Sequence, residues 1–173
     1  MQGPLELRVA EIEGAIAQIA RRFPQVPVSD TLTLRLLMLL GRELSSLLES
    51  SLRPHDLNDT DFRILMCLVS QPGGVACPSD LCAFVAQSPA NMTRVADALS
   101  ERGLITRTTS EHDRRRTMLR ITPAGEAMAH SLMPLVLGVT HGVFGDMPPS
   151  GRRALLDSLR SLTVQIDRRD PSR

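Results

Sequence analysis

The sequence predicts a mainly α-helical (α+β) protein with one β-hairpin in the second half of the chain. Leucine, alanine, methionine and arginine are abundant, and all four have high helix propensity. Apolar residues recur every three or four positions over several long segments, which is the periodicity of an amphipathic helix. Residues 104–109 and 117–122 are rich in Thr, Ile and Leu and favour paired strands instead. The length of 173 residues indicates one domain with extended ends.

Two long helices are expected at the start of the chain. The first covers about residues 4–22 and carries apolar residues in a heptad-like pattern: Leu5, Val9, Ile12, Ile16, Ile19 and Phe23. Pro24 and Pro27 interrupt the chain, and a leucine-rich helix then runs from a cap at Asp30 to about Leu52. Because this second helix is apolar over most of its surface, we expect it to be buried on more than one side.

Three shorter helices are expected between residues 58 and 103. Asn58 is a suitable N-cap for the first, and Asp61 favours the same helix end through the dipole. A helix over about 78–86 and a tight turn follow, and Ser88 then caps the third helix. Gly103 suits the left-handed position that ends the third helix. Two short helices joined by a short turn are the geometry of a helix-turn-helix.

The third of these helices has two distinct faces. At 100° per residue its apolar residues share one side: Met92, Val95, Ala96 and Leu99. The opposite side presents Ala90, which permits close approach, Asn91, which can bind adenine, and Arg94, which can bind guanine. The pattern suits a helix inserted into the major groove of DNA. Taken alone, it also suits an ordinary amphipathic helix with a solvated face, which is the commoner case.

The hairpin favours the DNA-binding interpretation. Its loop holds Asp113, Arg114, Arg115 and Arg116. A recognition-like helix followed directly by a hairpin with a basic tip is a winged helix-turn-helix, and arginine in a wing senses the negative potential of a narrow minor groove. The alternative is a solvated, flexible loop.

Charge is distributed unevenly along the chain although the net charge is only +1. Residues 88–120 contain seven Arg and four acidic residues, whereas residues 30–87 contain four Arg and seven acidic residues. The positive charge therefore lies where contacts to the phosphate backbone would need it.

Two helices are expected after the hairpin, one from Thr122-Pro123 to about Val143 and a last one over about 150–168. The last helix carries an apolar stripe: Leu155, Leu159, Leu162 and Ile166. Apolar helices at both ends of a chain often form dimers. We therefore expect dimerisation helices at 1–56, a winged helix-turn-helix DNA-binding domain at 57–122 and further dimerisation helices at 123–173.

Enzymatic, metal-binding and membrane functions find little support. The chain has no phosphate-binding glycine loop, no GxSxG motif and no paired-carboxylate motif, so we expect no enzyme and no cofactor. The histidines are not spaced as in a common metal site: His55, His112, His130 and His141. The N-terminus lacks a signal-peptide layout, and no apolar run approaches the ~20 residues of a membrane span.

The cysteines are most simply reduced thiols of a cytoplasmic protein, because three of them cannot form a complete disulfide framework and none forms a CxxC pair. Two alternatives to a DNA-binding regulator stay open. One is a thiol redox-sensing repressor that uses Cys67, Cys77 or Cys82. The other is a winged-helix scaffold that binds protein.

Four segments resemble the MarR family of bacterial repressors, and within it the EmrR (MprA) branch: Leu57–Phe62, Ser88–Leu104, Asp113–Arg115 and Leu119–Gly125. The resemblance covers about residues 30–135. It implies an obligate homodimer that binds a palindromic operator in double-stranded DNA. It also implies repression of multidrug efflux or aromatic-compound genes, with release by a small phenolic, aromatic or lipophilic effector.

The resemblance also implies roles for individual residues. Groove and phosphate contacts fall on the third short helix and its cap: Ser88, Ala90, Asn91, Thr93 and Arg94. Arg115 becomes the wing arginine in the minor groove, flanked by Arg114 and Arg116 and oriented by Asp113. The effector site falls between the dimerisation helices and the DNA-binding domain, with these candidates: Arg35, Met38, His55 and Met66. Arg35 could pair with an anionic ligand or with an acidic neighbour or partner subunit. No Cys precedes Cys67, so a peroxide-sensing Cys near the N-terminus is not expected.

Overall fold

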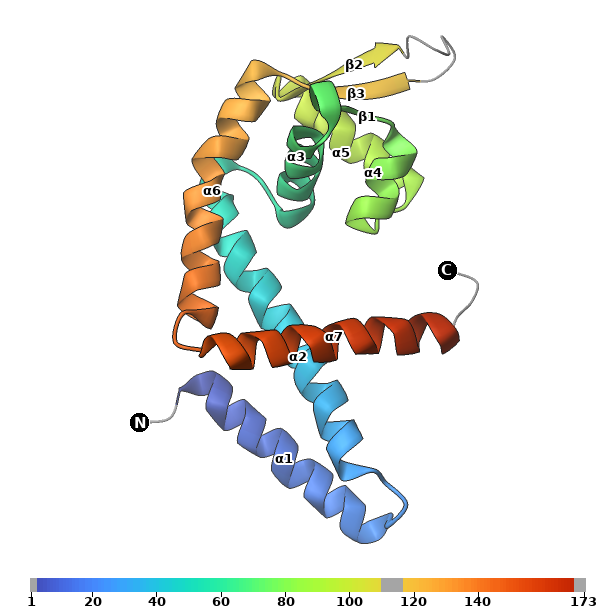
Figure 1. The fold of residues 1–173 in the computed structure, drawn as a ribbon, viewed down its shortest axis with the longest axis vertical. Coiled ribbons are helices and arrows are strands. Elements are labelled where there is room, and N and C mark those ends of the chain that lie inside the picture. Colours follow the sequence, from blue (N-terminus) through green and yellow to red (C-terminus); the bar gives the residue numbers. More distant parts are fainter. Residues whose placement is uncertain (1–2, 110–116, 170–173) are drawn as a thin grey trace.

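The structure is a computed structural model and describes residues 3–109 and 117–169 (Figure 1). It is mainly helical with one small sheet, as the sequence predicts. The helices are α1 (Pro4–Arg22), α2 (Val28–Leu52), α3 (Asp59–Ser70), α4 (Pro78–Val85), α5 (Pro89–Glu101), α6 (Pro123–Phe144) and α7 (Pro149–Arg169), with short 3₁₀ turns η1 (Arg53–His55) and η2 (Pro72–Gly74). The strands are β1 (Val75–Ala76), β2 (Ile105–Thr109) and β3 (Thr117–Ile121).

The sheet is antiparallel with the order β1-β3-β2. The predicted hairpin is confirmed, with Ile105 opposite Ile121 and Thr109 opposite Thr117. Strand β1 was not predicted. It has two residues, which is too few to show any periodicity, and it forms because Val75 lies opposite Arg120 on β3. The Arg120 side chain also donates to the Gly73 carbonyl oxygen at 2.9 Å.

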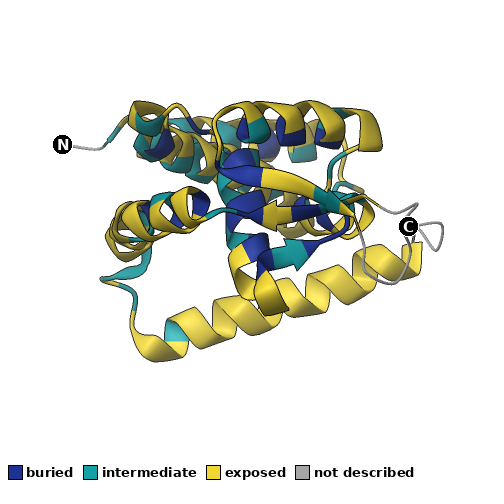
Figure 2. Cartoon of the chain, turned by 90° about the horizontal axis from the view of Figure 1, so that it is seen from above, coloured by how far each residue is buried: buried dark blue, intermediate teal, exposed yellow. Residues whose placement is uncertain are grey.

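The hydrophobic core lies in the head, by which we mean the described residues from 57 to 122. Figure 2 shows the buried residues gathered there. The core joins α3, α4, α5 and the strands to the end of α2 and the first half of α6. The predicted inner face of α5 is confirmed, since these residues are all buried: Met92, Val95, Ala96 and Leu99.

Local capping signals determine where the head helices begin and end. Asn58 Oδ1 accepts from the Asp61 backbone N–H, and Asp61 Oδ2 accepts from the Asn58 N–H, both at 3.0 Å. At the end of α5, Gly103 has φ +69° and the Leu104 N–H donates to the Leu99 carbonyl oxygen at 3.0 Å. These caps confirm the predicted helix ends.

The predicted cap at Asp30 is wrong. Helix α2 begins two residues earlier, at Val28, with Pro27 in extended backbone at the N-cap position. Asp30 lies in the first turn instead, where its carboxylate faces the positive end of the helix dipole. A proline at the cap loses no hydrogen bond, because the first N–H groups of a helix have no partner within the helix.

The α1–α2 hairpin and α7 extend away from the head (Figure 1). Arg8 of α1 pairs with Glu43 of α2 at 2.7 Å. Of the residues of α2, Leu39 and Leu52 are buried, whereas Leu34 and Met38 are about 60% exposed in the single chain. The expected burial on more than one side is therefore not achieved within one chain. Helix α7 is exposed from Arg152 to Arg169 (Figure 2).

The expectation that no apolar segment is long enough to span a membrane is wrong for helix α6. By length and composition it could cross a membrane, although we expected no apolar run of that size. Its first half instead packs on the head, where Ala129 and Leu132 are buried, and it also contacts α2. A helix that packs on several neighbours needs apolar residues around much of its circumference.

Candidate DNA-binding surface

The outward face of α5 matches the predicted contact surface. Ser88 caps the helix, its Oγ accepting from the Asn91 N–H at 3.3 Å. Ala90, Thr93 and Arg94 are exposed along the first two turns. The Thr93 hydroxyl donates to the Pro89 carbonyl oxygen at 3.1 Å, so its free lone pair remains for an incoming donor.

Three side chains on this face form a continuous hydrogen-bonded relay. Asn91 Nδ2 donates to Gln87 Oε1 at 2.6 Å. Arg94 donates to Asn91 Oδ1 from Nη2 at 2.8 Å and from Nε at 3.3 Å. Sequence reasoning singled out Asn91 and Arg94 but missed Gln87, which precedes the cap. The spacings from Gln87 to Asn91 and from Asn91 to Arg94 are the signal that could have revealed it.

Helix α5 is tied to both of its neighbours. Asp97 on α5 forms an ion pair with Arg107 on β2, at the root of the hairpin. Arg102, at the C-cap of α5, donates to the carbonyl oxygens of His55 at 2.9 Å and Asp56 at 2.5 Å. The end of α5 is thereby attached to the connector that follows α2. Neither contact was expected from the sequence.

Asp61, in the first turn of α3, is a buried acidic residue of the head. Burial raises the pKa of the Asp61 carboxyl above its ordinary value of 3.8, while the hydrogen bond from Asn58 and the charges of Arg102 and Arg94 lower it. Desolvation is the largest of these effects.

The predicted wing contacts lie outside the described residues: Asp113, Arg114, Arg115 and Arg116. The two strands that carry the wing are described and project past α5 in Figure 1. The structure thus shows the base of the wing next to the recognition helix. The contacts of the wing residues stay predictions.

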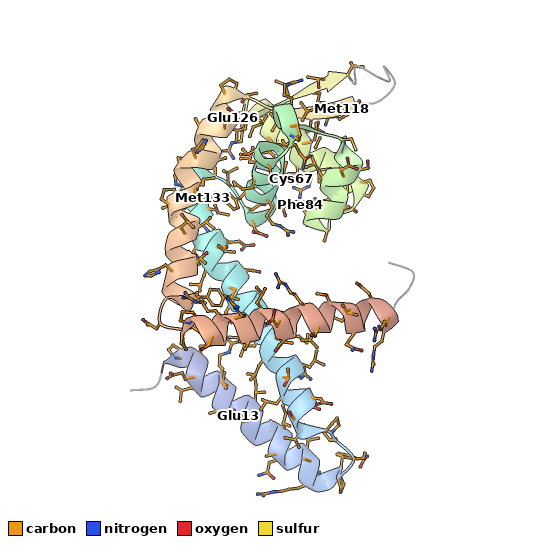
Figure 3. The ribbon with its side chains drawn as sticks, viewed as in Figure 1. Glu13, Cys67, Phe84, Met118, Glu126 and Met133 are labelled. Carbon is orange, nitrogen blue, oxygen red and sulfur yellow. The ribbon has the colours of Figure 1, made fainter. Side chains whose placement is uncertain are left out.

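The four residues predicted to bind the effector do not line one common cavity. Arg35 and Met38 line a groove of about 500 Å³ between α1 and α2, together with Arg8 and Arg42. Met66 lines a separate cavity of about 60 Å³ between α3 and α6, near the Met133 labelled in Figure 3. His55 lies in η1 and lines neither space.

A further cavity, of about 570 Å³, lies between α6 and α7 and was not predicted. Its lining is mostly leucine and phenylalanine, with Thr140, His141 and Arg152 as polar groups. Its residues come from two different helices, so no local motif signals it. Among the described residues, no three His, Cys, Asp or Glu side chains are grouped so that they could hold a metal ion.

The thiols are partly sequestered. Cys67 and Cys77 are buried and Cys82 is half-buried, and all three are free. Burial raises the pKa of the Cys67 thiol, with Asp80 acting in the same direction and a hydrogen bond from Gln71 opposing it. Figure 3 shows Cys67 inside the head. A thiol that resists deprotonation is a poor nucleophile, which argues against Cys67 as a sensor.

Comparisons with known proteins agree with this geometry. Residues 55–116 match the model of the MarR family. The chain is 29% identical over 156 residues to the transcriptional repressor MprA of Escherichia coli, covering 90% of this chain and 89% of MprA.

Two solved structures are similar over most of their length. AbsC, a MarR family transcriptional regulator from Streptomyces coelicolor, superposes with a TM-score of 0.76 at 22% identity, covering 82% of this chain and 96% of AbsC. BpsR from Bordetella bronchiseptica, whose DNA binding is regulated by 6-hydroxynicotinic acid, gives 0.67 at 24% identity, covering 75% and 91%. At these identities the two structures support the fold.

Proposed function

Because this chain belongs to the MarR family of transcriptional regulators, we propose that it is a homodimeric repressor that binds a palindromic operator and is released by a small ligand. Helix α5 enters the major groove, where Arg94 contacts a guanine and Ser88, Ala90, Asn91 and Thr93 lie against the groove and its phosphates. Arg114, Arg115 and Arg116 of the wing reach the minor groove or its phosphates, and Asp113 orients Arg115.

The observation that carries this proposal is the exposed face of α5. Its inner residues are buried, the exposed residues Ala90 and Thr93 are small, and Arg94 is exposed beside them. The helix is also held in the head by its buried face, which packs in the core, and it lies beside β2, where Asp97 pairs with Arg107. A helix held in this way presents its N-terminal half to a major groove without reorganisation of the head.

Dimerisation supplies the two-fold symmetry. Large apolar side chains are exposed on the helices outside the head, among them Leu34, Leu137 and Leu156. We assign residues 1–56 and 123–173 to the dimer interface and residues 57–122 to DNA binding. A second copy would bury this apolar surface, and light scattering should give twice the chain mass of 19.0 kDa. A monomeric mass would contradict this assignment.

The effector is proposed to be a small aromatic or lipophilic compound, of which a phenol or a salicylate-like acid is an example. The family resemblance and the aromatic acid that regulates BpsR support this class. The groove at Arg35 and Met38 offers cationic and apolar groups together. On the same grounds we propose control of multidrug efflux or aromatic-compound genes in the cytoplasm. Calorimetric titration with a panel of such acids tests the class, and DNA release should accompany binding.

Specific DNA binding is tested by fluorescence anisotropy with a duplex selected from a random library. Affinity should fall steeply with salt, because each phosphate contact adds about 0.9 to the slope of log K against log salt. Arg94→Ala should weaken specific binding by about 1–3 kcal/mol. Arg21→Ala, which removes an equal charge from the distant α1, should leave the ratio of affinities for selected and random duplexes unchanged (Figure 1). Equal affinity of the parent for selected and random duplexes would contradict the proposal.

A further inference from the structure

The relay on α5 constrains how Arg94 can meet a base. Arg94 has five N–H groups, which form two usable edges: a side edge made by Nε and Nη2, and an end edge made by Nη1 and Nη2. Asn91 Oδ1 accepts from both atoms of the side edge, at 3.3 Å from Nε and 2.8 Å from Nη2. The end edge, with one N–H from each terminal nitrogen, is left for an external acceptor. That edge matches the O6 and N7 atoms of guanine.

Asn91 is itself constrained by Gln87. A side-chain amide that reads adenine must offer its N–H₂ and its oxygen together to N7 and N6. In the structure the Asn91 oxygen is engaged by Arg94 and its Nδ2 donates to Gln87 Oε1 at 2.6 Å. The amide therefore has its donor side toward Gln87 and its acceptor side toward Arg94. An amide held in this way orients the arginine, and a bidentate pair with adenine would have to share its oxygen with Arg94 and its Nδ2 with Gln87.

Gln87 is well placed for this task. It is half-buried in the turn between α4 and α5, and its backbone N–H donates to the Cys82 carbonyl oxygen at 3.0 Å. The preceding residue, Ala86, has φ +53°, so the turn has a defined conformation. The anchor of the relay is thus part of the turn, whereas its far end, Arg94, is exposed.

We propose that Gln87 is a positioning residue for base recognition, which holds Asn91 as the orienting partner of Arg94 so that Arg94 presents its end edge to a guanine. This rests on the proposed DNA-binding function and gives Asn91 a different role from the expected contact with adenine. The benefit is pre-organisation, because an arginine that is already ordered loses less side-chain entropy on binding. Gln87 acts through Asn91 and does not touch the base.

The experiment measures discrimination, defined as the ratio of affinities for the selected duplex and for duplexes with single base-pair changes. Arg94→Ala should lower discrimination at one guanine position by roughly five- to 150-fold. Asn91→Ala should lower it at the same base pair. Gln87→Ala should also lower it there, by roughly two- to tenfold, which is the factor expected for leaving one long side chain unordered. The salt slope should not change in Gln87→Ala, because no phosphate contact is lost.

Two further variants test whether Gln87 acts on discrimination through Asn91 and Arg94. Gln87→Glu keeps an oxygen that can accept from Asn91 Nδ2, so discrimination should return to the parent value even if its added negative charge lowers affinity for all duplexes alike. In the Arg94→Ala background, Gln87→Ala should have no further effect on discrimination. Gln71→Ala, which removes an exposed glutamine at the end of α3 outside the relay and the proposed DNA contacts, is the matched control and should keep the discrimination of the parent.

Each contrary outcome has a distinct meaning. If Gln87→Ala keeps full discrimination, the relay is wrong. The relay is also wrong if Gln87→Ala lowers discrimination as much in the Arg94→Ala background as in the parent. If Asn91→Ala relaxes a separate adenine position, Asn91 reads a base itself and the proposal is overturned. If the parent shows no discrimination at all, the DNA-binding proposal fails, and the relay fails with it. If the parent binds specifically and Gln87→Ala keeps the discrimination of the parent, the relay is overturned and the DNA-binding proposal stands.

Discussion

The backbone of Gly125 lies directly against the carbonyl oxygen of Leu104. A Cβ atom added at Gly125 would overlap that oxygen and come within 2.9 Å of Ile121 Cγ1. The Leu104 oxygen also accepts from the Thr122 N–H at 3.1 Å, and the Thr122 hydroxyl donates to the neighbouring Gly103 carbonyl oxygen at 2.7 Å. The end of the recognition helix, the hairpin and the start of α6 therefore meet at one point.

Gly125→Ala should destabilise the head strongly, because the obstructing atom belongs to the backbone and cannot rotate away. We expect a loss of about 1–3 kcal/mol, the usual cost of overpacking. Gly138→Ala in the same helix is the control. A Cβ there meets nothing within 4 Å in the chain, so it should be neutral or stabilise by up to about 1 kcal/mol. Urea unfolding at a fixed protein concentration measures both, and equal stabilities would contradict the close contact.

Asp61 should give the stability of the head a defined pH dependence. Its pKa is raised in the folded state, mainly by burial, so the folded chain holds the proton more tightly than the unfolded chain. Stability from this group is thus fully present below pH 3.8 and is lost as the pH rises through the raised pKa. In Asp61→Asn this component should disappear, while the amide oxygen still accepts from the Asn58 N–H.

The measurement for Asp61 is urea unfolding over a series of pH values. The difference in unfolding free energy between parent and Asp61→Asn should fall as the pH increases above about 4 and then become constant. Asp59→Asn removes a carboxylate from the same first turn and serves as the control. A difference that rises with pH would show that the folded state favours the charged form.

The Asp97–Arg107 ion pair should contribute little to stability. Its side chains are 55% and 43% exposed, so solvent screens their attraction. A double-mutant cycle with alanine at both positions should give a coupling of about 0.2–1 kcal/mol that decreases with salt. The more exposed Asp157–Arg160 pair on α7 is a reference and should give less. A coupling of several kcal/mol would contradict the exposure seen in the structure.

The wing arginine can be tested by its effect on salt dependence. Arg115→Ala should lower affinity and reduce the salt slope by about 1, with a smaller change in base preference than Arg94→Ala. Asp113→Ala should resemble it, since Arg115 would lose the carboxylate proposed to orient it. Anisotropy titrations at several salt concentrations measure both. Unchanged slopes and affinities in the two variants would show that the wing does not contact DNA.

Local signals made much of the head predictable from sequence. The cap at Asn58 and the stop at Gly103 act within a few residues, so their consequences are visible in the sequence itself. The inner face of α5 follows from helical periodicity in the same way. Strand β1 could not be found, because its two residues form a strand only through pairing with β3.

Features that depend on distant residues were harder to predict. The burial expected of α2 is missing in one chain, because an apolar surface does not reveal whether its partner lies within the chain or outside it. The effector candidates were chosen by chemistry along the sequence, and the structure places Arg35 and Met66 in different cavities. The relay from Gln87 was missed because the orientation of a side-chain amide depends on its partners.

The central claim is that two copies of α5 read a two-fold DNA site. Hydroxyl-radical footprinting of the parent protein on a duplex selected from a random library tests it most directly. We predict two protected patches on one face of the duplex, related by a two-fold axis, with half-site centres about 10 base pairs apart. Protection of a single half-site, or uniform protection without preferred positions, would contradict the claim.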